Sequence, residues 1–236
     1  MNRAVPPPLV RVPGTPAARP KEAATLIIYR RDGDGIKVLM GERHGKHRFL
    51  PQRWVFPGGR IDPTDARVRT GSDLRPDVAT QLERKLSRAR ALAYAIAAVR
   101  ETFEETGLVI GAPDPSPGRR VSEAWREFFG TGMAPALDNL EYIARAVTPP
   151  IRPLRFNARF FMIHERHVAG DMAVSRELVD LRWFPIGQAR ELEIPMITRK
   201  ILFHIEELIT DPPPPDPHRP IPYFKHTGDR HVRIDE

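Results

Sequence analysis

One segment of this sequence, a helix with two opposed faces, constrains the fold more than any other. Its apolar residues recur at helical spacing, and they are Leu92, Ile96, Val99 and Phe103. Glu101, Glu104 and Glu105 stand at positions i, i+3 and i+4, which places their carboxylates on one face about one turn apart. Gly107 follows and can adopt the left-handed conformation that ends helices. The pattern predicts a helix that anchors one side in a core and presents carboxylates on the other.

The three carboxylates need a positive partner. Like charges at this spacing repel each other by about 0.2–0.5 kcal/mol per pair, even on an exposed helix. Hard divalent cations prefer oxygen ligands and would relieve that repulsion. A glutamate-rich face is, on the other interpretation, simply solvated. The neighbouring residues favour a cation, because Arg100 precedes Glu101 and the pair Gly58-Gly59 follows an apolar run.

Together these residues resemble the nudix box, written G-x5-E-x7-R-E-U-x-E-E-x-G-U with U aliphatic. Gly59 matches its first glycine. The second half is matched in order by Arg100, Glu101, Glu104, Glu105, Gly107 and Leu108. Asp65 stands where the pattern has glutamate, Thr102 occupies an apolar position, and 34 residues separate Asp65 from Arg100 where the pattern has seven. A box split in this way resembles that of the peroxisomal coenzyme A diphosphatase branch and its bacterial relatives.

The resemblance covers residues 23–210 and implies an α/β fold. The expected form is a nudix-type α/β/α sandwich with a mixed sheet, a loop–helix–loop catalytic motif and a helical insert within the box, and the mixed order of strands and helices agrees. Strands are expected at 23–30, 38–40, 54–56, 142–147, 159–164 and 178–184. Helices are expected at 76–106, as one helix or two with a bend, and at 121–129 and 195–209.

Proline clusters divide the chain into a central domain and two ends. Many of the 26 prolines lie in residues 1–22 and 211–236, which are expected to be proline-rich tails and candidate arms in a homodimer. Residues 23–210 are the expected nudix domain, with the insert at about 66–92. The insert is rich in basic residues and is a candidate lid, dimer surface or solvated helix.

Composition excludes several classes of protein. The chain has no cysteine, which excludes a disulfide framework, a thiolate metal site and a cysteine nucleophile. No run approaches the roughly 18 apolar residues of a membrane span, and no apolar signal core is present, so a cytoplasmic protein without membrane contact is expected. The net charge of +7 suits polyanionic small molecules and nucleic acid alike. No RNA-binding module supports the second choice.

The carboxylate cluster supplies the candidate catalytic and metal-binding residues. Glu101, Glu104 and Glu105 are the expected ligands of Mg²⁺ or Mn²⁺, and Glu104 or Glu105 is the candidate general base. The resemblance implies that the carbonyl of Gly59 is a further ligand. Arg100 is expected to hold a carboxylate in place through paired hydrogen bonds.

Glu177, Asp65 and the basic loop before Gly58 can each be interpreted in two ways. Glu177 precedes Trp183 by six residues, a spacing similar to that of the distal metal ligand or base of some nudix enzymes; the alternative is a charge beside a strand. Asp65 is either the acidic residue of the box or a cap or loop charge. The loop before Gly58 contains residues for phosphate binding, or else is a solvated basic loop; its candidates are Arg43, Arg48 and Arg53.

The expected function is metal-dependent hydrolysis of a diphosphate in a nucleoside diphosphate linked to another moiety. Coenzyme A or acyl-coenzyme A is the first substrate by resemblance, although a glycine that the coenzyme A signature has near Arg53 is absent. ADP-ribose, NADH and dinucleoside polyphosphates stay open. The other classes are a catalytically silent nudix ligand-binding module and an enzyme that processes RNA caps or 5′ ends.

Overall fold

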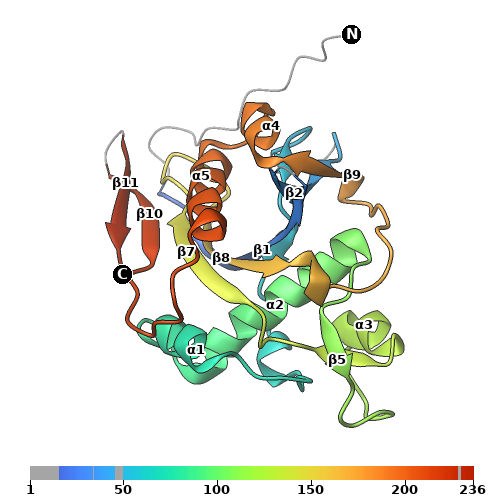
Figure 1. Cartoon of the computed structure of the whole chain (residues 1–236). Coiled ribbons are helices and arrows are strands. Elements are labelled where there is room, and N and C mark those ends of the chain that lie inside the picture. The colour runs from blue at the N-terminus through green and yellow to red at the C-terminus, as the bar shows by residue number, and fades with distance from the viewer. Residues whose placement is uncertain (1–15, 34, 46–49, 228–229) are drawn as a thin grey trace.

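A mixed sheet forms the middle layer of the structure, a computed structural model that describes residues 16–33, 35–45, 50–227 and 230–236 (Figure 1). Within these residues nine strands join in the order β11-β10-β7-β8-β1-β2-β3, with β4 beside β1 and β9 beside β2. The strands are β1 (Lys21–Asp32), β2 (Gly35–Arg43), β3 (Trp54–Val55), β4 (Gly58–Arg60), β7 (Glu141–Val147), β8 (Phe156–His164), β9 (Leu178–Pro185), β10 (Pro222–Thr227) and β11 (Arg230–Asp235). A separate small ribbon pairs β5 (Gly111–Pro113) with β6 (Met133–Pro135).

Strand β1 is the central strand and accounts for the mixed character of the sheet. It runs parallel to β8 from Lys21 to Tyr29 and antiparallel to β2 near its end. Its consecutive residues Leu26, Ile27 and Ile28 are all fully buried. Such a run, apolar on both faces, requires helices on both sides of the sheet. The predicted α/β/α sandwich is confirmed (Figure 1).

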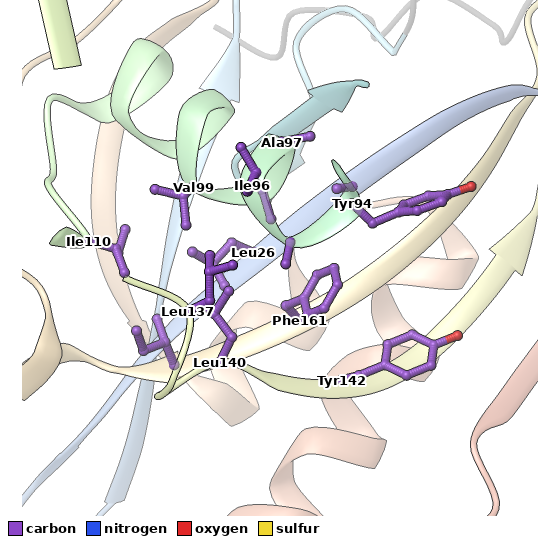
Figure 2. Close-up of a cluster of buried hydrophobic side chains, with 14 of the residues drawn as sticks. Leu26, Tyr94, Ile96, Ala97, Val99, Ile110, Leu137, Leu140, Tyr142 and Phe161 are labelled. Atoms are coloured by element: carbon purple, nitrogen blue, oxygen red, sulfur yellow. The ribbon is translucent and has the colours of Figure 1, made fainter. Parts of the chain in front are cut away.

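Two helices, α1 (Pro76–Glu83) and α2 (Arg88–Thr106), cover one face, and α3 (Arg126–Gly130) packs against α2 and β6. Side chains of α2, among them Tyr94, Ile96 and Val99, pack towards Leu26 and Phe161 of the sheet (Figure 2). The helical stretch predicted at 76–106 is two helices, because Ser87 has an extended backbone with ψ of 156°. The helix predicted at 121–129 is a 3-10 turn, η2 (Glu123–Trp125), followed by the short helix α3.

The end of α2 follows the sequence pattern. Gly107 adopts φ of 73°, and its N–H donates to the carbonyl of Phe103 at 2.8 Å. The left-handed conformation costs glycine little, so the helix ends at Thr106 and the carboxylates lie in its final two turns. The predicted helix stop is confirmed.

The other face is covered by α4 (Ile186–Glu191) and α5 (Met196–Thr210) (Figure 1). Ile201, Leu202 and Ile205 of α5 are fully buried and share a core cluster with Ile27 and Phe160 of the sheet. Their helical spacing is the apolar face expected at 195–209. None of the helices in the described residues combines the length and the apolar composition needed to cross a membrane.

The insert is a layer of the hydrophobic core. Leu74, Val78 and Leu82 are 5%, 0% and 1% exposed and belong to the core cluster around α2. Neither a lid nor a solvated helix buries its side chains to this extent. The charged residues of the insert are mostly basic, but these few apolar residues determine how α1 packs against α2.

The C-terminal segment joins the sheet. The composition predicts a proline-rich tail over residues 211–236, yet β10 and β11 form an antiparallel hairpin, and β10 pairs in parallel with β7. Phe224 is 5% exposed in this position. A proline is tolerated as the first residue of a strand, which is where Pro222 stands. The second half of the segment thus packs as part of the domain and not as an arm. At the other end, β1 begins at Lys21, inside the expected N-terminal tail.

Candidate active site

The site is built where the sheet forks beside β1. One edge of β1 pairs with β4 at Ala23–Thr25 and with β2 at Tyr29–Asp32, and between them the Leu26 N–H donates to Pro57 O at 3.0 Å. This fork brings the Gly58-Gly59 loop against the last turns of α2. A pocket of about 1580 Å³ opens there. Its lining at this end includes Gly58, Gly59, Glu101, Glu104, Glu177, Arg43 and Arg53.

Arg100 organises the carboxylates. Its Nε and Nη2 donate to the two oxygens of Asp65 at 3.0 and 3.1 Å, and Nη2 also donates to Arg60 O at 2.9 Å. Its Nη1 donates to Glu101 at 2.9 Å and to both oxygens of Glu104 at 3.2 Å. Burial alone would lower the pKa of Arg100, but these anionic partners raise it, so the guanidinium is a permanent charge. The guanidinium therefore fixes where the carboxylates lie.

Asp65 is fully buried on the 3-10 turn η1 (Asp65–Arg67). Besides Arg100, it accepts a hydrogen bond from the Trp125 indole N–H at 3.1 Å and from the Asp62 N–H at 2.8 Å. It is thus the buried partner of Arg100, and Asp62 is the turn residue, whose carboxylate accepts from Thr64. Sequence reasoning missed Trp125, because it lies 60 residues from Asp65 and no local pattern links them.

Glu101 and Glu105 are the most buried of the three glutamates. Glu105 is 3% exposed; one oxygen accepts the Gly58 N–H at 2.8 Å, and the other, Oε1, has no hydrogen-bond partner. Burial raises the pKa of Glu105 to about 8. Burial raises the pKa of Glu101 to about 7, against the opposing charge of Arg100. Both shifts have the same first cause, because burial disfavours the charged form of a carboxylate.

Glu104 and Glu177 are the more accessible carboxylates. The Glu104 side chain is 41% exposed, and its pKa is raised chiefly by burial. The negative charge of Glu177 raises the pKa of Glu101, Glu104 and Glu105, so the structure brings this residue to the cluster across more than 70 residues of sequence.

Arg43 and Arg53 occupy different parts of the pocket. The Arg43 side chain is largely buried, lies 3.8 Å from Glu177, and its charge lowers the pKa of Glu105. Arg53 lies further out and forms an ion pair with Glu193. The predicted phosphate-binding residue Arg48 lies outside the described residues.

The donor set suits a hard divalent cation, although it is not arranged as a finished metal site. In the part of the chain that the structure describes, no three acidic or histidine side chains are grouped closely enough to hold an ion. Arg100 is instead the positive partner of Glu101 and Glu104. Oxygen donors are the ligands that Mg²⁺ prefers, and the unpartnered Oε1 of Glu105 is a buried acceptor of this type. The ligand atoms of these residues therefore suit such an ion, and Arg100 fixes the positions of Glu101 and Glu104.

Alanine substitutions of two adjacent glycines are expected to have different effects, one on cation binding and the other on the stability of the fold. A Cβ on Gly59 would stand 2.2–2.6 Å from the Glu101 carboxylate, which can move aside. We expect Gly59→Ala to stay folded and to weaken Mn²⁺ binding about 10-fold, measured by electron paramagnetic resonance. A Cβ on Gly58 would stand 2.4 Å from the carbonyl of Ala24 in β1, at φ of 153°. Gly58→Ala should therefore lower the free energy of unfolding by roughly 3 kcal/mol. Equal effects of the two variants on both measurements would contradict this assignment.

The raised pKa values predict how stability depends on pH. Glu101 and Glu105 titrate at about 7 and about 8 in the folded chain, above the roughly 4.3 of an unfolded glutamate. Their contribution to the free energy of unfolding is thus complete below the unfolded pKa of roughly 4.3. It is lost as pH rises through the folded pKa values of about 7 and about 8, because the unfolded chain gives up these protons first. In the presence of EDTA, Tm should fall between pH 6 and pH 8.5, and Mg²⁺ should restore it most at pH 8.5, where the ligands are deprotonated. Glu105→Gln should flatten the curve; an unchanged slope in that variant would refute the assignment.

Comparison with known proteins agrees with this geometry. No family model matches the chain. Nudix hydrolase 7 of Caenorhabditis elegans is 29% identical over 161 residues, which are 62% of this chain and 46% of that protein. The acyl-coenzyme A diphosphatase NUDT19 of Xenopus laevis is 27% identical over 135 residues, 40% of this chain and 36% of that protein. The chain thus spans less than half the length of these curated relatives.

The solved structures include a similar fold. The crystal structure of a nudix hydrolase from Alicyclobacillus acidocaldarius superposes with a TM-score of 0.63 and 27% identity, covering 80% of this chain and 91% of that one. Because this match covers 80% of the chain, it extends well beyond the motif. With its split box folded into one loop–helix unit around Arg100, the chain is similar to nudix hydrolases in both sequence and fold.

Proposed function

We propose that this protein is a divalent-cation-dependent diphosphatase that hydrolyses a nucleoside diphosphate linked to another moiety. The observation that carries the proposal is the meeting of three carboxylates at one end of a pocket of about 1580 Å³, beside a fourth carboxylate that is buried. Glu101, Glu104 and Glu177 line the pocket, and Glu105 is the buried one. Burial raises the pKa of Glu101 to about 7 and that of Glu105 to about 8, so their charged forms need a positive partner. A site with this need is suited to cations that arrive together with an anionic substrate.

Each residue has a role in this proposal. Glu101, Glu104 and Glu105 hold the cation, with the Gly59 carbonyl as a further ligand; when bound, the cation neutralises the diphosphate and makes a bound water more acidic. Glu104 is the candidate general base, because it is the most exposed of the three, whereas Glu105 is sealed beneath the Gly58 N–H. It takes a proton from water as the water oxygen bonds to phosphorus and the bridging P–O bond breaks. Arg43 and Arg53 line the pocket as partners for the phosphates.

Coenzyme A or acyl-coenzyme A is the first proposed substrate. The similarity to an acyl-coenzyme A diphosphatase supports it. The pocket supports a substrate with two sizeable halves, since its volume exceeds the roughly 300–1,000 Å³ of common ligand sites. Away from the carboxylates its walls include the apolar residues Phe156, Phe160, Ile197 and Phe224. ADP-ribose, NADH and dinucleoside polyphosphates are the alternatives.

The test is a panel of diphosphates incubated with Mg²⁺ and with Mn²⁺, with products identified by mass spectrometry and Glu104→Gln as the inactive control. Cleavage of coenzyme A to 3′,5′-ADP and 4′-phosphopantetheine would support both the reaction and the substrate. Cleavage of other members alone would retain the reaction and discard the substrate. Ligand binding without cleavage of any member would favour a silent binding module. Steeply salt-dependent binding to a long RNA would favour RNA processing instead.

A further inference from the structure

We propose that Trp125 is a positioning residue of the carboxylate site, which acts through Asp65 and Arg100. The inference rests on the function proposed above and extends it to a residue outside the box. Trp125 ends the 3-10 turn η2, is fully buried, and donates its indole N–H to Asp65 Oδ1 at 3.1 Å. Among the described residues its indole N–H bonds to Asp65 and to no glutamate, so its effect on the glutamates is transmitted by the Asp65–Arg100 ion pair.

The hydrogen bonds of Asp65 form a closed set. Oδ1 accepts from Arg100 Nε and from the Trp125 indole; Oδ2 accepts from Arg100 Nη2 and from the Asp62 N–H. Each oxygen thus has one donor from Arg100 and one from the surrounding fold. Without the indole N–H, Oδ1 keeps a single donor, and the carboxylate is free to rotate about its remaining contacts. A buried charged acceptor that loses a donor is costly, so such a rotation is expected.

Aromatic packing fixes the indole relative to α2. The Trp125 ring lies 5.3 Å from the Phe128 ring and 6.0 Å from that of Phe129. Phe128 in turn lies 5.2 Å from Phe103 of α2, three residues after Arg100. The Arg69 guanidinium stacks on Phe129 at 4.1 Å. The donor is therefore held in place by the same helix that carries the glutamates.

The geometry of Arg100 transmits this constraint. The guanidinium is planar, so the two bonds to Asp65 set the direction in which Nη1 reaches Glu101 and Glu104. Asp65 is one methylene shorter than the glutamate found in the nudix pattern, which leaves its carboxylate less reach towards the arginine. An indole donor that fixes one of its oxygens makes up for that lost freedom. Supporting groups of this kind typically change metal affinity or activity by about 10–100-fold when removed.

The test is Trp125→Phe, which keeps an aromatic ring and removes the N–H. In the full metal-free chain, we expect Mn²⁺ affinity to fall about 10-fold by electron paramagnetic resonance, without any substrate present. On a cleaved substrate, kcat should fall by a similar factor while KM stays within about twofold. Trp183→Phe is the matched control. Trp183 of β9 stacks against Arg30 of β1, and no hydrogen bond joins it to the cluster in the described part of the chain, so both values should stay as in the wild type.

Two measurements distinguish a role of Trp125 in positioning Asp65 from a role in packing alone. In an Asp65→Asn background, Trp125→Phe should have little further effect on Mn²⁺ affinity, because the pathway is already broken. The Trp125 indole N–H resonance, identified by its loss in Trp125→Phe, should shift in Asp65→Asn. Wild-type Mn²⁺ affinity in Trp125→Phe, or a loss of equal size in both backgrounds, would overturn the proposal. A chain that cleaves nothing but binds Mn²⁺ in a Trp125-dependent way would refute the proposed function alone.

Discussion

Replacing Glu104 with glutamine is expected to lower kcat by about 10²–10⁴-fold, the range for loss of a general base. Glutamine has the same length and keeps an oxygen that can accept from Arg100 Nη1, which now donates to both Glu104 oxygens at 3.2 Å. It cannot take a proton from water or bind a cation with a full negative charge. Steady-state kinetics on the best diphosphate of the panel would measure the loss.

The fold should tolerate this change, and that makes the kinetic result interpretable. Glu104 is 41% exposed at the side chain, so its removal leaves no buried charge unpaired, and Tm should stay within a few degrees. Glu127→Gln is the matched control, since Glu127 is exposed on α3, outside the pocket. Full turnover by a well-folded Glu104→Gln protein would remove Glu104 from the chemistry, whatever the other carboxylates do.

The helix at the centre of this site was predictable because its signals are local. The apolar spacing, the i, i+3, i+4 carboxylates and Gly107 lie within a few turns of each other, and each reports a property of the helix itself. The alternating and continuous apolar runs likewise located β1, β7, β8 and β9. The order of elements then left few arrangements other than a sheet between helices.

The role of Trp125, the place of the C-terminal strands and the packing of the insert could not be predicted. They depend on contacts between distant segments, which the periodicity of a single segment does not encode. The bond from Trp125 to Asp65 spans 60 residues, and the pairing of β10 with β7 spans more than 70. In the first case the apolar spacing predicted a helix at 121–129, and in the second the composition predicted a proline-rich tail. Likewise, the many charged residues of the insert suggested an exposed segment. The burial of Leu74, Val78 and Leu82, which determines where α1 packs, was not predicted. Charged residues describe the solvent side of an element, while a few apolar positions decide what it packs against.

Arg100→Met is expected to be the most destabilising single change at the site. It leaves the fully buried Asp65 with only the Trp125 and Asp62 donors and no compensating charge. Breaking a buried ion pair in this way typically costs about 3–5 kcal/mol. For a chain of this size that corresponds to a fall in Tm of about 10 °C, measurable by calorimetry. Arg88→Met on the same helix is the control, because its ion pairs with Glu83 and Asp73 lie at the surface and should contribute less than about 1 kcal/mol.

A double variant tests the reason for that loss. Asp65→Asn combined with Arg100→Met removes both charges, so no unpaired ion stays buried and part of the lost stability should return. Turnover should not return with it, because Glu101 and Glu104 still lack the guanidinium that orients them. If the double variant is no more stable than Arg100→Met, the buried charge of Asp65 is not the cause. If stability and turnover recover together, Arg100 serves the fold alone, and the carboxylates find their positions without it.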